Sequence, residues 1–251
     1  MHHTNLSPAE VSRYSRQLAI PGWGRESQER LKSSKVLIAG AGALASSVAL
    51  HLLAAGVGAI RLVDPTRVGL SDLHHQVLYR EKDLGEAKAT IAMRRLKEIN
   101  PFAEVEGQDK SISGHNVSRL TSGCHLLIDA MNNLTVTHLL NQAAVKLRLP
   151  LIHAVVWETE GYLTTFWPGQ GPCLACAFPD TNASAPGPVA LLGPLPGLVG
   201  SLQAMEAMRL LGGHGPGLLG KLLRIKGDLF RFSESPVRVN PQCLVCRRLN
   251  Q

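Results

Sequence analysis

Two glycines and an acid stand where a nucleotide would meet the backbone. Residues 36–64 read VLIAGAGALASSVALHLLAAGVGAIRLVD. Gly40 permits a tight turn, Gly42 lets backbone N–H groups approach a phosphate, and the N-terminus of the next helix adds partial positive charge. Asp64 ends the second apolar run, where a carboxylate accepts hydrogen bonds from ribose hydroxyls. The spacing predicts a nucleotide-binding turn between a strand and a helix.

Four of the five cysteines form two CxxC pairs. They are Cys173 and Cys176, then Cys243 and Cys246. Two such pairs offer the four thiolates of a tetrahedral Zn²⁺ site, and four protein ligands leave no open position, so we expect the zinc to be structural. Two disulfides or a redox dithiol are the alternatives. A cytosolic location disfavours disulfides, and a redox CxxC motif would not need a second copy. Cys124 is expected to be a core residue.

Composition limits the possible partners and location. The chain has 251 residues, 45% of them hydrophobic, which is enough for a full α/β core. The formal net charge is +7, but Lys and Arg are scattered, so we expect no nucleic-acid partner; an acidic protein partner fits equally well. No signal-peptide pattern and no apolar run of about 18 residues is found, so we expect a cytoplasmic protein without membrane contact.

Alternating strands and helices must hold these residues in place. We expect strands at 36–38, 60–63, 103–108, 125–130 and 150–156, with helices at 43–55, 86–99, 115–120 and 134–147 between them. This order predicts an α/β fold with a doubly wound, mainly parallel Rossmann-like sheet. Alternating apolar and polar residues at 162–167 and 222–232 predict antiparallel strands that extend it, with a helix at 198–211.

Further motifs follow one another along the chain in a fixed order. They are RYSRQ at 13–17, the glycine turn, LVD at 62–64, SDL at 71–73, GEAK at 85–88, the two CxxC pairs and GSLQAMEA at 200–207. From about Arg13 to the C-terminus the chain thereby resembles the MoeB/ThiF/HesA group, the ubiquitin-activating-enzyme-like adenylyltransferases of bacteria. The polar start of the chain predicts a flexible N-terminus over 1–12, and the resemblance implies one adenylation domain over 13–251. Its nucleotide-binding half is 13–156, and its antiparallel, zinc-bearing half is 157–251.

The same resemblance implies a reaction and a set of roles. Such proteins use ATP and Mg²⁺ to adenylate the C-terminal glycine of a small β-grasp, ubiquitin-like sulfur carrier similar to MoaD or ThiS, and they act as dimers. On this pattern Arg16 reaches the ATP phosphates of the neighbouring subunit, Lys88 contacts phosphate in its own subunit, and Asp64 holds the ribose. Gly40 and Gly42 let the backbone approach the nucleotide.

Four positions depart from the family pattern. Asp72 replaces a neutral asparagine, His75 a phosphate-binding arginine, Asn132 the Mg²⁺-binding aspartate and Thr137 a further arginine. Loss of a hard anionic ligand or of a permanent cation costs about 2–4 kcal/mol of transition-state stabilisation each. Asp72, His75 and the adjacent His74 either form a different metal or phosphate site or belong to a solvated loop.

Three functions therefore remain open. The first is ATP-dependent adenylation of a sulfur carrier through an altered site. The second is a non-catalytic relative that binds a ubiquitin-like carrier or a catalytic paralogue and lends Arg16 to that partner. The third, a dinucleotide-binding oxidoreductase, rests on the glycine turn and Asp64 alone. The sequence leaves open whether the dimer is a homodimer or a heterodimer.

Overall fold

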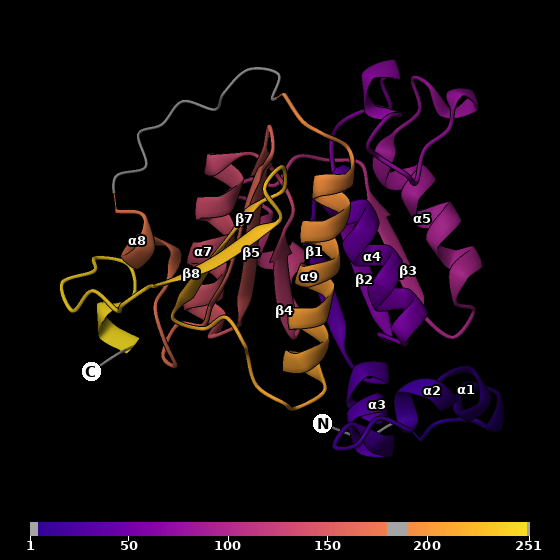
Figure 1. Ribbon diagram of the computed structural model, residues 1–251, viewed down its shortest axis with the longest axis horizontal. Helices are drawn as coiled ribbons and strands as arrows, with labels where there is room; N and C mark the ends of the chain where they lie inside the picture. Colours follow the sequence, from indigo (N-terminus) through magenta and orange to yellow (C-terminus); the bar gives the residue numbers. More distant parts are fainter. Residues whose placement is uncertain (1–4, 180–189, 250–251) are drawn as a thin grey trace.

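A single mixed sheet organises the part of the chain that the structure describes (Figure 1). The computed structural model describes residues 5–179 and 190–249. The strands are β1 (Lys35–Ala39), β2 (Ala59–Val63), β3 (Glu104–Gln108), β4 (Leu126–Asp129), β5 (Leu151–Trp157), β6 (Glu160–Phe166), β7 (Lys221–Lys226) and β8 (Arg231–Pro236). Their order is β3-β2-β1-β4-β5-β6-β7-β8, parallel from β3 to β5 and antiparallel from β5 to β8. The predicted fold class is confirmed.

Helices cover both faces of the sheet, because successive residues of a buried strand point to opposite sides. In β1, Val36 and Ile38 pack into the core that α4 (Ala43–Ala55), α5 (Lys88–Ile99) and α9 (Pro194–Leu211) close. Leu37 and Ala39 pack instead against α6 (Val117–Thr121) and α7 (Leu134–Leu147). The remaining elements are α1 (Pro8–Arg13), α2 (Ser15–Leu18), α3 (Gly24–Lys32), α8 (Leu174–Ala177) and the 3₁₀ turns η1 (Leu70–Asp72), η2 (Glu81–Asp83) and η3 (Arg247–Leu249).

The crevice for a ligand lies where the strand order reverses. From β1 the chain passes through α4 to β2 on one side, while β4 pairs with β1 on the other side. In open parallel sheets, ligands bind beyond the carboxyl ends of the strands at such a point. Gly40, Asp64 and Ala130 directly follow β1, β2 and β4, so the topology places all three at this edge.

A helix begins within residues 1–12, the segment predicted to be flexible. Residues 1–4 lie outside the described residues, but α1 begins at Pro8 behind a capping box of Ser7 and Glu10. The buried Glu10 carboxylate also pairs with Lys32 Nζ at 2.7 Å. Helix capping and an ion pair to α3 thus hold a segment that composition alone suggested would be frayed.

Two elements in the second half also differ from their predicted extents. Helix α9 begins at Pro194, four residues before the predicted start, because proline fits the first helical turn, where its missing N–H has no partner to lose. The predicted strand at 222–232 is part of a hairpin of β7 and β8, with Phe230 at φ 50° in the turn. No helix among the described residues is both long and apolar enough to cross a membrane.

Candidate nucleotide site and cysteine cluster

The turn after β1 forms a cradle, defined here as Gly40, Ala41 and Gly42. Gly40 has φ +104°, and a Cβ there would lie 2.9 Å from the carbonyl oxygen of Ala130, so only glycine fits without strain. Gly42 is the N-cap of α4, which directs the positive end of this helix at the crevice. The backbone predicted for a nucleotide-binding turn is therefore present.

Asp64 holds the shape of the cradle. Its Oδ2 accepts a hydrogen bond from the Ala41 N–H at 2.8 Å. Its Oδ1 accepts from the backbone N–H and the hydroxyl of Thr66, at 2.7 and 2.5 Å. A carboxylate has about four acceptor positions, so three are engaged by the protein and about one is left for a ligand hydroxyl.

Lys88 is buried and already neutralised. Only 7% of the residue is exposed, and Lys88 Nζ lies 2.9 Å from Asp72 Oδ2. The same oxygen accepts from the Gly69 N–H at 2.8 Å, while Asp72 Oδ1 accepts from Gln76 Nε2 at 2.7 Å. The lysine that the resemblance assigns to phosphate is thus held by the acid that replaces the family's asparagine.

This ion pair lies next to the cradle. The hydroxyl of Tyr79 donates to the Ala41 carbonyl at 2.5 Å and lies 3.3 Å from the Lys88 carbonyl, so it joins the two backbones. Burial raises the pKa of Tyr79 far above its usual range, which keeps the phenol a donor. The side chain of Gln76 approaches from the other side, with Nε2 3.8 Å from the position of a Cβ on Gly42.

His75 does not replace the cation of an arginine. Burial, followed by the charge of His74, lowers the pKa of His75 below its usual value, so the ring is neutral at pH 7. His75 Nδ1 and Gln76 Oε1 are both buried without a hydrogen-bond partner. Two neutral polar atoms beside the cradle are therefore unsatisfied.

At the end of β4, the buried acid is Asp129 and not the following polar pair. Asp129 is fully buried, and its Oδ2 lies 2.8 Å from His153 Nδ1 and accepts from the Thr137 hydroxyl at 2.6 Å. Asn132 is exposed. His153 and Thr137 line a cavity of about 330 Å³ whose walls include Trp157, Tyr162 and Phe178. Sequence reasoning missed His153, whose only signal was a histidine within an otherwise apolar strand.

The residues present do not fit Mg²⁺ or a triphosphate. Asn132, at the position where the resemblance implies a Mg²⁺-binding aspartate, is a neutral amide. Within residues 5–179 and 190–249, the cysteines are the only group of three or more His, Cys, Asp or Glu side chains arranged to hold a metal. The side chains of Asp72, His74 and His75 are therefore not arranged as a metal site. The cation at Lys88 is already paired, so a polyphosphate would have to displace a carboxylate.

Arg16 lies far from the cradle of its own chain. The next residue, Gln17, donates through Nε2 to the carbonyl of Ala55, at the C-terminal end of α4. The cradle is at the other end of this 13-residue helix, which corresponds to about 20 Å at 1.5 Å per residue. Figure 1 shows α2 below the sheet, while the segment between β2 and α5 lies above it. The exposed Arg16 is thus separated from Gly40, Gly42, Asp64 and Lys88, which the fold brings together.

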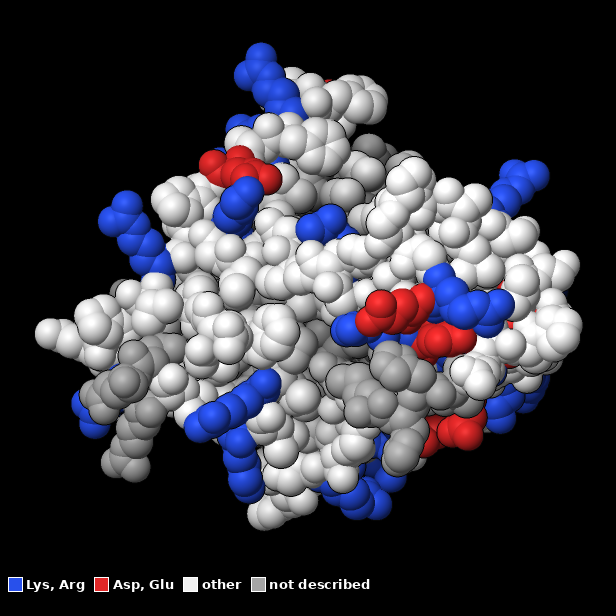
Figure 2. Space-filling model, turned by 90° about the horizontal axis from the view of Figure 1, so that it is seen from below, with Lys and Arg blue, Asp and Glu red and all other residues white. Residues whose placement is uncertain are grey.

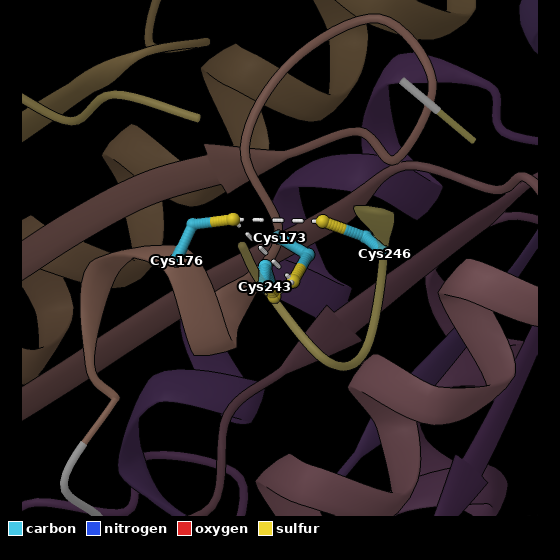
Figure 3. A group of neighbouring side chains, drawn as sticks. All are labelled: Cys173, Cys176, Cys243 and Cys246. Atoms are coloured by element: carbon cyan, nitrogen blue, oxygen red, sulfur yellow. Dashed lines mark hydrogen bonds between the residues drawn. The ribbon is translucent and has the colours of Figure 1, made fainter. Parts of the chain in front are cut away.

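The two CxxC pairs converge into one cluster (Figure 3). All four sulfurs lie within 4.8 Å of one another, with Cys173 and Cys243 at 3.7 Å and Cys176 and Cys246 at 3.5 Å. Burial raises the pKa of Cys173 to about 11 in the absence of a cation. Four convergent thiols fit Zn²⁺, which would deprotonate them and join α8 to the C-terminal segment. Cys124 is buried and lies outside the cluster, in the core where it was expected.

Basic side chains do not gather on the face seen in Figure 2. Lys and Arg are scattered there among neutral residues, with acidic groups between some of them. This distribution offers no continuous basic stripe of the kind that tracks a nucleic-acid backbone on that face.

Comparison with known proteins agrees with this geometry. Residues 14–245 match the ThiF family. The sulfur carrier protein adenylyltransferase of Thermus thermophilus is 39% identical over 248 residues, which cover 94% of this chain and 91% of the relative. The SAMP-activating enzyme E1 of Haloferax volcanii is 37% identical, with 96% and 91% covered. A crystal structure of E. coli MccB with ATP has a TM-score of 0.83 at 23% identity, covering 98% of this chain and 76% of that one, and so shares the fold. The chain belongs to the ThiF family.

Proposed function

We propose that this protein takes part in sulfur-carrier activation by binding a small β-grasp carrier or a catalytic paralogue, and that its own site does not adenylate. The observation that carries the proposal is the buried ion pair between Lys88 and Asp72 beside the cradle. A cation that already has a buried partner contributes little to binding a polyphosphate, because the new contact replaces an existing one.

The remaining departures act in the same direction. His75 is neutral where an arginine would clamp phosphate, and Asn132 has no charge for Mg²⁺. If the changes at positions 72, 75 and 132 were independent, at about 2–4 kcal/mol each, together they would remove roughly 10⁴-fold or more of the rate. Retention of the fold with loss of these charges favours a binding role.

Arg16 supports a role within a dimer. Because the neighbouring Gln17 contacts the opposite end of α4 from the cradle, any phosphate contact of Arg16 would have to be made to a neighbouring chain. In a heterodimer it would complete the phosphate site of a catalytic paralogue, and in a homodimer it would face an equally altered site. We therefore favour a paralogue as partner, in the cytoplasm, with a structural Zn²⁺ on Cys173, Cys176, Cys243 and Cys246.

A second candidate is adenylation by this chain itself. It is favoured by the intact cradle and by the 39% identity to the Thermus adenylyltransferase. The oxidoreductase hypothesis gains no support, because the glycine turn and Asp64, on which it rests, are explained by the ThiF family to which the chain belongs.

ATP–pyrophosphate exchange with a candidate carrier separates the two candidates. We expect no exchange by the native protein. The triple variant Asp72→Asn, His75→Arg, Asn132→Asp should gain ATP affinity, measured by calorimetry with Mg²⁺, because it frees one cation, adds another and restores a metal ligand. A matched variant that also carries Lys88→Ala should lose most of this gain. Clear exchange by the native protein would overturn the proposal and establish the second candidate.

A further inference from the structure

We propose that the cradle of this chain accepts a nucleoside, or a nucleotide with at most one phosphate, in place of ATP. The inference rests on the proposed function, because a chain that adenylates its carrier must bind ATP. It follows from the charges and the unsatisfied polar atoms that surround the cradle.

The charge around the cradle is unfavourable for a polyphosphate. Asp64 contacts the Ala41 N–H directly, and Asp72 lies in the adjacent ion pair. Lys88 contributes one positive charge against these two carboxylates, so the three side chains together carry a net negative charge. A triphosphate carries about four negative charges, which these net negative surroundings repel.

The unsatisfied atoms call for hydroxyl groups. Gln76 is only 6% exposed, and its orientation is set because Nε2 donates to Asp72 Oδ1 at 2.7 Å, which leaves Oε1 as an acceptor without a donor. His75 Nε2 lies 3.4 Å from Gln76 Nε2; when it accepts from that amide, the neutral ring carries its proton on the unpaired Nδ1. The site thus lacks one donor and one acceptor.

A ribose supplies both, whereas an ionised phosphate supplies acceptors only. A hydroxyl can donate to Gln76 Oε1 or accept from His75 Nδ1, and a second hydroxyl can donate to the remaining acceptor position of Asp64. A buried polar atom without a hydrogen-bond partner is unfavourable, so pairing these atoms favours a sugar. One phosphate can still meet the N-terminus of α4 at Gly42.

Calorimetric titration of the full-length protein with adenosine, AMP and Mg²⁺-ATP tests the inference. For the native protein we expect adenosine and AMP to bind with similar affinity and ATP at least about tenfold more weakly. Asp72→Asn keeps the side-chain size and removes one negative charge, so it should tighten ATP by about tenfold and change adenosine by less than about threefold.

Asp83→Asn is the matched control. Asp83 ends η2 as Asp72 ends η1, its Oδ2 accepts from the backbone N–H of Arg80 as Asp72 accepts from Gly69, and it pairs with Arg95. This variant should leave the order of the three affinities unchanged.

Three outcomes would overturn the inference: ATP binding as tightly as adenosine, no binding of adenosine or AMP, or no response of ATP to Asp72→Asn. Pyrophosphate exchange in the same preparations tells the two proposals apart. Absence of exchange together with absence of nucleoside binding defeats the inference and leaves the proposed function, whereas exchange defeats both.

Discussion

The cysteine cluster and the lysine–aspartate pair each bring together side chains from separate segments, yet they differ in one respect. At the cysteines, four groups of the same kind lie within 4.8 Å of one another. At the cradle, Lys88 lies 2.9 Å from an acid that offsets its charge. The four thiols offer ligands to a cation that the chain itself does not provide. Lys88, in contrast, is already neutralised by the carboxylate of Asp72 in the same chain.

The two sites therefore differ in whether they are stable without a bound ligand. Without a cation, burial favours the neutral thiol at Cys173, so no charge pairing holds this cluster together, whereas a divalent cation would be bound by four thiolates. A buried pair of opposite charges is stable without any ligand. The comparison therefore predicts a metal at the cysteines and weak polyphosphate binding at the cradle.

The largest effect is expected at the cysteine cluster. Cys243→Ser should reduce bound zinc from one per chain to below detection and lower the free energy of unfolding by about 3–5 kcal/mol, or roughly 10 °C in Tm. Metal analysis and calorimetry measure the two effects. Cys124→Ala is the control, because this buried cysteine lies outside the cluster and should keep its full metal content. Equal zinc in both variants would contradict a four-thiolate site.

The next effect concerns the buried pair beside the cradle. Asp72→Ala or Lys88→Ala alone should lower the free energy of unfolding by about 3 kcal/mol, because each leaves an uncompensated charge. The double variant should cost less than the sum by about 2 kcal/mol. Urea denaturation of the four proteins gives this coupling energy. If the free-energy losses of the two single variants simply add up in the double variant, the two side chains do not neutralise each other. The proposed difference between this pair and the cysteine cluster would then be wrong.

The cradle glycines should respond unequally. Gly40→Ala should cost about 2–3 kcal/mol of stability, because its φ of +104° is strained for alanine and the new Cβ would press on the Ala130 carbonyl. Gly42→Ala should cost less than about 1 kcal/mol, since the nearest atom to its Cβ, Gln76 Nε2, is 3.8 Å away. Adenosine affinity should fall in the Gly42 variant despite its stability. Unchanged affinity would place the ligand elsewhere.

The smallest effect is expected at an ion cluster on β2 and β3 that belongs to neither region and provides a baseline. The Arg61 guanidinium, with Lys35, holds the pKa of Glu106 at about 2, below the ordinary 4.5. A lowered carboxyl pKa adds stability above pH 4.5 that is lost as the pH falls from 4.5 to 2. The side chain is 36% exposed and therefore screened, so we expect about 1 kcal/mol or less.

Glu106→Gln should lower the free energy of unfolding slightly at pH 7 and flatten its decline below pH 4.5, as followed by urea denaturation at several pH values. Glu104→Gln, on the exposed side of the same strand, is the comparison. Identical pH profiles for the two variants would remove the assigned role of Arg61.

Local patterns were sufficient for most of the fold. The apolar run before Gly40, the helix up to Ala55 and the strand ending at Val63 all appear where periodicity and turn residues placed them. Predictions failed at boundaries that depend on neighbours. The ordering of α1 needs the ion pair between Glu10 and Lys32, whose partners lie 22 residues apart.

Residue types and their spacing by themselves determined the α/β order, the glycine turn and the presence of four thiols that could bind a metal. Only the tertiary structure decided that Asp72 neutralises Lys88, that His153 meets Asp129, and that Arg16 lies too far from its own cradle to serve it. The physical reason is that backbone conformation depends on nearby residues in the chain, whereas charge pairing depends on distance through space, which the packing of α4, α5 and the sheet alone sets.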